Sequence, residues 1–254
     1  LHNWFSSFGG YRQAIKPIID ATGLNTSSVI RYDSMCYYSS IHSIKGLNDW
    51  TSSTSVYTLA NMFVGATNFR FPTGDSNYNF NDNFGTNLLN ATNTNGIFSY
   101  VGSTIILDGG SESEIGDPPN LTNWNLSSGS SMITWMSGCY FNSNPDFSTM
   151  SFPTAAVPYT NFMNGVHIIG TVNKLVLNNA NGVRPSSMRQ AFSSTRINEY
   201  EFPSTWDFSN TTDFYQMFYY AGEQPADATN PSYRNIRVEF PTNLDFGSVT
   251  SAVN

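Results

Sequence analysis

Two short patterns of apolar and polar residues alternate along this chain. In the first, an apolar residue and a polar spacer precede Phe-Pro, as in Tyr200-Glu201-Phe202-Pro203. Apolar and polar residues that alternate over so short a stretch are typical of a half-buried strand, and proline ends the strand because it has no amide proton to donate. The sequence therefore predicts short strands here, at 69–72, 150–153 and 238–241, and in the proline-free apolar runs at 105–107 and 175–177.

The second pattern is a Met-Phe pair followed by small residues. In its best copy, Phe214, Met217, Phe218 and Ala221 are spaced i, i+3, i+4 and i+7, which predicts one buried face of a short helix. Residues of this pattern recur at intervals that are typical of a stacked solenoid. The equivalent positions are predicted to form one column of Cys36, Phe63, Phe98, Met136, Met163, Phe192 and Phe218.

Strand, turn and short helix together form one repeating unit that is too small to bury its own apolar face. The predicted fold is an α/β repeat, a leucine-rich-repeat-like solenoid of short parallel strands with short helices on the opposite side. Residues 1–40 are predicted to form an N-terminal capping or irregular repeat, and 41–254 the solenoid, with loop insertions near 74–84, 109–120 and 223–232. The copy at 244–249 stops before its Met-Phe pair, so we expect that the parent polypeptide continues or that a neighbouring chain covers this end.

The segment from Trp206 to Phe218, which reads Trp-Asp-Phe-Ser-Asn and later Met-Phe, resembles the BspA-like leucine-rich repeat family and the related repeats of mycoplasma variable surface lipoproteins. The resemblance covers most of the chain from about residue 40. It implies a protein without enzymatic activity that is displayed outside a cell and binds host proteins, glycans or other surfaces. Chains of similar composition, neutral and rich in Asn, Ser, Thr and aromatic residues, are also typical of phage fibres and capsid decorations.

Charge and hydropathy exclude several classes of partner. Only 11% of the 254 residues are charged and the net charge is -7, which argues against nucleic acid because phosphate binding needs clustered Lys and Arg. No apolar run approaches the ~20 residues of a membrane-spanning helix. The family resemblance and the likeness in composition to phage fibres imply a location that is extracellular, on a cell surface or on a virion surface.

The two cysteines are predicted to be free, buried thiols. Cys36 occupies a core position of the Met-Phe pattern, and Cys139 lies about three repeats later. With layers ~5 Å apart, their Cα atoms would lie beyond the ~7 Å that a disulfide spans.

A search for catalytic motifs finds little. The three histidines, His2, His42 and His167, have no metal-ligand spacing, and the chain contains no phosphate-binding loop and no nucleophile elbow. We therefore expect no enzyme, no cofactor and no metal site. A third hypothesis, behind the two given below, is a glycosidase that uses Glu201 and Glu239, should these carboxylates face each other.

The outward spacers of the predicted strands are the candidate binding residues. Such an extended face adds many weak contacts along a solenoid, although solvated spacers without a partner would show the same pattern. The favoured function is a surface recognition or adhesion module for a protein or glycan. The alternative is a structural subunit of a phage virion fibre, a capsid decoration or a cell-surface filament, for which an oligomer is expected. The candidate positions are Arg70, Ile106, Ser151, Val176, Glu201 and Glu239, flanked by Lys174, Glu199 and Arg237.

Overall fold

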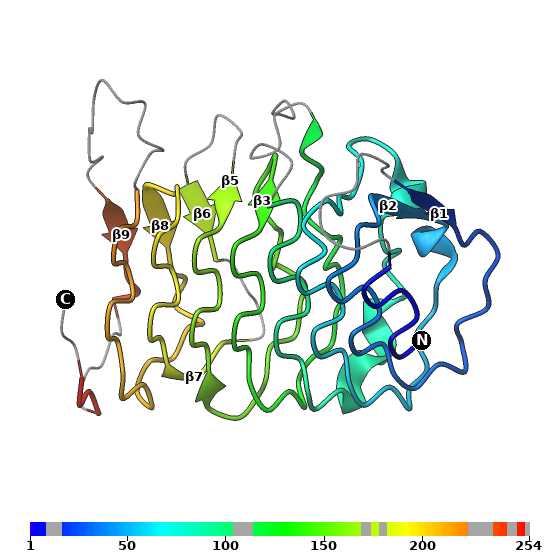
Figure 1. The fold of residues 1–254 in the computed structure, drawn as a ribbon. Helices are drawn as coiled ribbons and strands as arrows, with labels where there is room; N and C mark the ends of the chain where they lie inside the picture. Colours follow the sequence, from blue (N-terminus) through cyan, green and yellow to red (C-terminus); the bar gives the residue numbers. More distant parts are fainter. Residues whose placement is uncertain are drawn as a thin grey trace, which may run out of the picture.

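The chain winds as a β-solenoid whose coils lie side by side from the N-terminus (blue) to the C-terminus (red), as Figure 1 shows. This computed structural model describes residues 1–8, 17–103, 114–168, 174–177, 182–222, 236–242 and 248–251. Among these residues no α-helix is present, so the solenoid part of the fold prediction is confirmed and the helical part is wrong.

Short strands of successive coils pair in parallel, because each strand returns in the same direction after one coil. The pairs are β1–β2, β3–β5 and β4–β7, and β6, β8 and β9 form a three-stranded sheet. Three short 3-10 helices are also present, η1 (Leu47–Asp49), η2 (Ser76–Tyr78) and η3 (Gly85–Asn90). The strands are β1 (Ile18–Asp20), β2 (Ser43–Lys45), β3 (Tyr140–Phe141), β4 (Val157–Pro158), β5 (His167–Ile168), β6 (Lys174–Val176), β7 (Pro185–Ser187), β8 (Glu199–Glu201) and β9 (Arg237–Glu239).

The Met-Phe segments form a ladder of turns where helices were predicted. Alternate amides of each segment donate to the next coil, as Cys36 does to the carbonyl of Met62 at 2.7 Å. The amides between them donate three residues back within the same segment, as Met35 does to Tyr32 at 3.3 Å. The same alternation recurs in successive coils, so each segment is both a run of turns and a strand of a parallel ladder. We call this column of segments the turn ladder.

Left-handed backbone at two positions per segment prevents a helix. Asn61 and Gly65, four residues apart, have φ of 58° and 68°, whereas an α-helix needs right-handed dihedrals throughout. The buried positions nevertheless keep helical spacing. In one segment Tyr159, Phe162 and Met163 are fully buried, at i, i+3 and i+4. A turn ladder and an amphipathic helix therefore bury the same sequence pattern, and periodicity alone does not separate them.

The predicted column of equivalent positions is confirmed by the hydrogen bonds of the turn ladder. In a parallel pair, an amide donates to the residue that precedes its aligned partner. The amide of Phe63 donates to Ile97, immediately before Phe98, and the amide of Phe98 donates to Trp135, immediately before Met136. The remaining members align in the same way. Phe5, whose amide donates to Met35 at 2.7 Å, extends the column by one coil before Cys36.

An aromatic core runs along the axis of the solenoid. Phe63 stacks on Phe98 with ring centroids 5.7 Å apart and planes 12° apart, and Trp135 stacks on Phe162 at 5.7 Å and 9°. These rings are fully buried. Since these rings pack against equivalent rings of a neighbouring coil and the buried residues form a single cluster, the coils share one continuous core, as the size of the repeat requires.

The many Asn and Asp residues form turns at the corners of the coils. The carboxylate of Asp207 accepts a hydrogen bond from the amide of Ser209 at 3.0 Å, and the side chain of Asn125 accepts from Ser127 at 3.2 Å. Side chains of this type bond their own backbone two residues on and set the turn. Asp75 forms a turn of the same kind, because its side chain accepts a hydrogen bond from the amide of Asn77 at the start of η2.

Both cysteines are free and fully buried, as predicted. Burial raises the pKa of each thiol far above its usual value, because the thiolate would lose its hydration. The thiol of Cys139 donates to the carbonyl oxygen of Phe98 at 2.7 Å. Both residues are therefore part of the inert core.

Candidate functional site

The β6–β8–β9 sheet brings six of the outward residues onto one face. Lys174, Glu199 and Arg237 are in register across the three strands, and two residues further on Val176, Glu201 and Glu239 are in register as well. The residues between them, Leu175 on β6 and Tyr200 on β8, are buried in the core. Successive residues of a strand point to opposite faces, so the outer face is built from these side chains alone. We call it the charged face: Lys174, Val176, Glu199, Glu201, Arg237 and Glu239.

Ion pairs connect the side chains of the charged face. Lys174 Nζ lies 2.5 Å from Glu201 Oε2, and Arg237 Nη2 lies 2.5 Å from Glu239 Oε1. The hydrogen bond to Glu201, together with the negative charges of Glu201, Glu239 and Glu199, raises the pKa of Lys174. Such exposed pairs contribute little to stability, because solvent screens them. With two cations and three carboxylates, the face carries an excess of one negative charge, and Glu199 has no ion pair within the described chain.

The structure does not place Arg70 or Ser151 on the charged face. Arg70 donates from Nη1 to the carbonyl of Glu114 at 2.7 Å, and Ser151 forms a parallel bridge with Asn125. The four Phe-Pro segments therefore do not form one ladder, and only those of β8 and β9 pair directly. Their phenylalanines, Phe202 and Phe240, stack at 5.4 Å. Ile106 lies outside the described residues.

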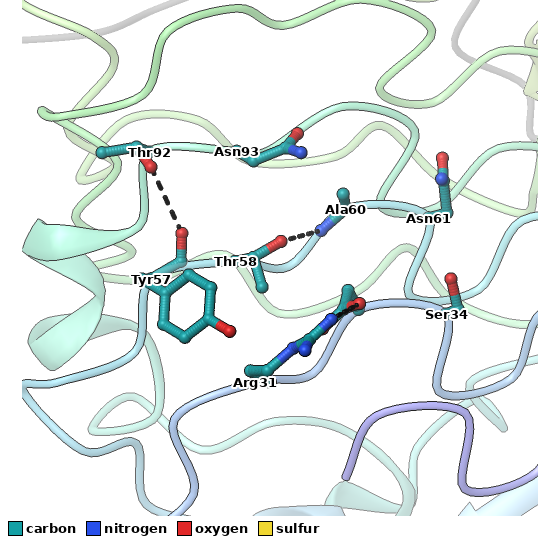
Figure 2. A pocket seen from close by; sticks show the side chains of 9 residues that line it. Arg31, Ser34, Tyr57, Thr58, Ala60, Asn61, Thr92 and Asn93 are labelled. Carbon is teal, nitrogen blue, oxygen red and sulfur yellow. Dashed lines mark hydrogen bonds and ion pairs between the residues drawn. The ribbon is translucent and has the colours of Figure 1, made fainter.

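A second feature, which the sequence did not indicate, is an open hollow on another side of the solenoid (Figure 2). Its volume is about 350 Å³, and it spans three coils that are joined by the bridges Arg31↔Thr58 and Thr58↔Asn93. We call it the Tyr57 hollow. Its lining consists of Arg31, Asp33, Ser34, Tyr57, Thr58, Ala60, Asn61, Thr92 and Asn93.

One ion pair fixes the cationic group of the Tyr57 hollow. Arg31 donates from Nε to Asp33 Oδ1 at 2.9 Å and from Nη2 to Asp33 Oδ2 at 2.7 Å. Burial alone would raise the pKa of Asp33, but the hydrogen bond from Arg31 and the charges of His2 and Arg31 outweigh it and lower that pKa. The guanidinium also lies over the ring of Tyr57, 5.8 Å from its centroid. Arg31 is therefore held in place and neutralised within the hollow.

His167 is a histidine with a strongly perturbed pKa. Its ring lies 4.2 Å from that of Tyr140, and its Nδ1 atom is buried without a hydrogen-bond partner among the described residues. Burial, with a smaller contribution from the charge of Arg196, lowers the pKa of His167 to about 3. His167 is therefore neutral in the folded protein at neutral pH, and its surroundings indicate packing against Tyr140.

This shift predicts a pH dependence of stability. Below pH ~6.5 the unfolded chain protonates His167 while the folded chain does not, so stability falls as the pH decreases from 6.5 towards 3. We expect His167→Gln to reduce this slope by up to ~1.4 kcal/mol per pH unit. Urea unfolding of both proteins over this pH range measures the difference, and parallel curves would contradict the burial of the neutral ring.

Comparison of the chain with protein-family models, curated proteins and solved structures finds no match. Within the described ranges no helix has the length and hydropathy to cross a bilayer. The same part of the chain contains no group of three or more His, Cys, Asp or Glu side chains arranged to hold a metal ion.

Proposed function

We propose that this chain is a non-enzymatic recognition module that acts outside a cell or on a virion surface and binds a partner through the outside of its coils. The resemblance to BspA-like repeats supports this function. In the described part of the chain, aromatic side chains fill the axis of the solenoid. The charged side chains of β6, β8 and β9 lie on the outside of the coils.

The observation that carries the proposal is the charged face. It gathers Lys174, Glu199, Glu201, Arg237 and Glu239 from three adjacent coils on a regular parallel sheet. A face with fixed spacing and an excess of carboxylates suits a partner surface that carries basic groups, since complementary charges steer association and fix its register. The ion pairs within the face preorganise the side chains for such a partner.

A charge-neutralising variant tests the proposal. The chain is probed against arrays of immobilised extracellular proteins and glycans, and each interaction found is measured again with the triple variant Glu199→Gln, Glu201→Gln and Glu239→Gln. We expect affinity to fall about tenfold or more, and the binding of the unmodified chain to weaken with salt.

A matched control removes the same number of charges elsewhere. Asp49, Asp82 and Asp146 are exposed, and asparagine at these positions keeps an oxygen for the hydrogen bonds that the carboxylates accept. The triple variant Asp49→Asn, Asp82→Asn and Asp146→Asn should bind like the unmodified chain. Equal losses in both variants would show that net charge, not the charged face, governs binding.

A second candidate function, a structural subunit of a surface assembly, is favoured by the turn ladder. The amides of Phe218 and Tyr220 donate no hydrogen bond to a described residue, although the equivalent amides of other coils pair with the next coil. In the segment 1–8, the carbonyls of Trp4 and Ser6 likewise accept none from the described chain. A second copy could continue the ladder by pairing these donors with these acceptors.

Such pairing is head-to-tail, so it would produce filaments or rings instead of two-fold dimers. Sedimentation velocity over a wide range of concentrations distinguishes the two functions. Growth of the sedimenting species with concentration supports the structural subunit, and one monomeric species throughout contradicts it.

A further inference from the structure

We propose that the Tyr57 hollow binds a neutral sugar residue of a glycan. This site is separate from the charged face, so the inference goes beyond the proposed function. The volume of about 350 Å³ lies at the lower end of the range for small-ligand sites, which suits one or two sugar rings and not a folded partner.

The position of Tyr57 is the first observation. Its side chain is 43% exposed, while its neighbours Val56 and Thr58 are buried. Tyrosine offers a flat apolar ring together with a polar hydroxyl, and a sugar ring presents a face of C–H groups that packs on such a surface. Arg31, which also lines the hollow, lies beside the ring of Tyr57 with its guanidinium carbon 5.8 Å from the ring centroid (Figure 2).

The charge of the hollow is the second observation. Arg31 donates two hydrogen bonds to the carboxylate of Asp33. Its guanidinium is therefore already paired with an anionic group, and an anionic ligand would have to replace Asp33. The formal charges of this pair cancel, and His2, whose Nδ1 lies 2.7 Å from Asp33 Oδ2, adds a positive charge only where its ring is protonated. The hollow therefore favours a neutral, hydroxyl-rich ligand over a phosphate, a sulfate or a sialic acid.

Free hydrogen-bonding groups are the third observation. The side chains of Asn61 and Asn93 are exposed, line the hollow opposite Tyr57 and Arg31, and form no side-chain hydrogen bond with any described residue (Figure 2). Each carboxamide offers two donors and one accepting oxygen, the combination that pairs with neighbouring hydroxyl groups. The amide of Asn61 donates to the carbonyl of Asn95, and the carbonyl of Asn93 accepts from the amide of Leu59. These backbone hydrogen bonds hold both residues in place.

The test uses an array of neutral oligosaccharides that end in a hexose or an N-acetylhexosamine, together with sialylated and sulfated forms. We expect the full chain to bind at least one neutral glycan. Tyr57→Ala should weaken that binding about tenfold or more, Asn93→Ala should weaken it as well, and Tyr57→Phe should retain it because the ring remains.

Tyr219→Ala is the matched control, since the side chain of Tyr219 is 41% exposed and lies outside the hollow. Its binding should equal that of the unmodified chain. Binding of anionic glycans only, no binding of any neutral glycan, or equal losses in Tyr57→Ala and Tyr219→Ala would each overturn the inference.

The glutamine variant of the charged face separates this inference from the proposed function. A glycan interaction that is lost with Glu199→Gln, Glu201→Gln and Glu239→Gln but is unchanged by Tyr57→Ala would overturn the sugar site and leave the recognition module intact. The opposite result supports the sugar site alone.

Discussion

Replacing Phe98 with alanine is expected to lower the free energy of unfolding by ~3–5 kcal/mol. Phe98 is fully buried in the middle of the aromatic core, where it stacks on Phe63 at 5.7 Å and contacts the rings of Trp124 and Trp135, both at 5.7 Å. Its loss opens a cavity between neighbouring coils that share this core. An isolated domain is stable by only ~5–15 kcal/mol, so the substitution removes a large part of the total.

Urea unfolding followed by tryptophan fluorescence measures this effect. Leu89→Ala is the control, because the side chain of Leu89 on η3 is 40% exposed and its truncation should cost less than ~1 kcal/mol. Similar losses in the two variants would show that the aromatic residues do not form a continuous core.

Replacing Gly46 with alanine is expected to cost ~2–5 kcal/mol, from backbone strain of ~1–2 kcal/mol and steric overlap of ~1–3 kcal/mol. Gly46 has φ 88°, in the left-handed region that disfavours a side chain. An added Cβ would lie 2.5 Å from the amide nitrogen of Thr22 and 2.7 Å from the carbonyl carbon of Ala21. These are backbone atoms of the preceding coil, so they move aside only if the coils separate.

Gly74→Ala separates strain from overlap in the same experiment. Gly74 has φ 74°, but an added Cβ would meet no atom within 4 Å. Its substitution should therefore cost only the ~1–2 kcal/mol of backbone strain. If Gly46→Ala lowered the free energy of unfolding no more than Gly74→Ala does, this result would contradict the close approach of the first coils.

The repeat register could be predicted from the sequence because each repeat places one bulky residue at the same core position. Phe63, Phe98 and Met136 align in the structure as their sequence context predicts. The helices could not be predicted correctly, because the turn ladder buries residues at the spacing of a helix. The positions of the glycines were the evidence in the sequence against helices. Gly65, Gly138 and Gly165 occur two residues after the aligned core position, where glycine inside a helix would cost ~1 kcal/mol.

The charged face could be predicted in part because strand alternation is local. Tyr200 points inward and Glu199 and Glu201 point outward in β8, as the pattern indicates. Arg70 and Ser151 do not lie on this sheet, because their segments have other partners: Phe71 bridges to Asp117, and Ser151 bridges to Asn125. The Tyr57 hollow had no local signal, since it depends on how three coils align at Arg31, Thr58 and Asn93.

The central claim is that the Met-Phe segments stack at strand spacing, because this spacing places both the charged face and the Tyr57 hollow. Gln190 and Gln216 occupy equivalent positions in adjacent coils, where Gln190 Nε2 donates to Gln216 Oε1 at 2.8 Å. Adjacent strands lie ~4.8 Å apart, within the ~4.4–6.8 Å that a disulfide requires between Cα atoms. Packed helices would lie ~8–10 Å apart.

Disulfide formation in the double variant Gln190→Cys and Gln216→Cys therefore tests this claim most directly. We expect complete cross-linking under mild oxidation. Asn161→Cys with Gln216→Cys should form no cross-link, because Asn161 lies one coil further away in the same column. Failure of the first pair to cross-link, or equal cross-linking of both pairs, would contradict the stacked turn ladder.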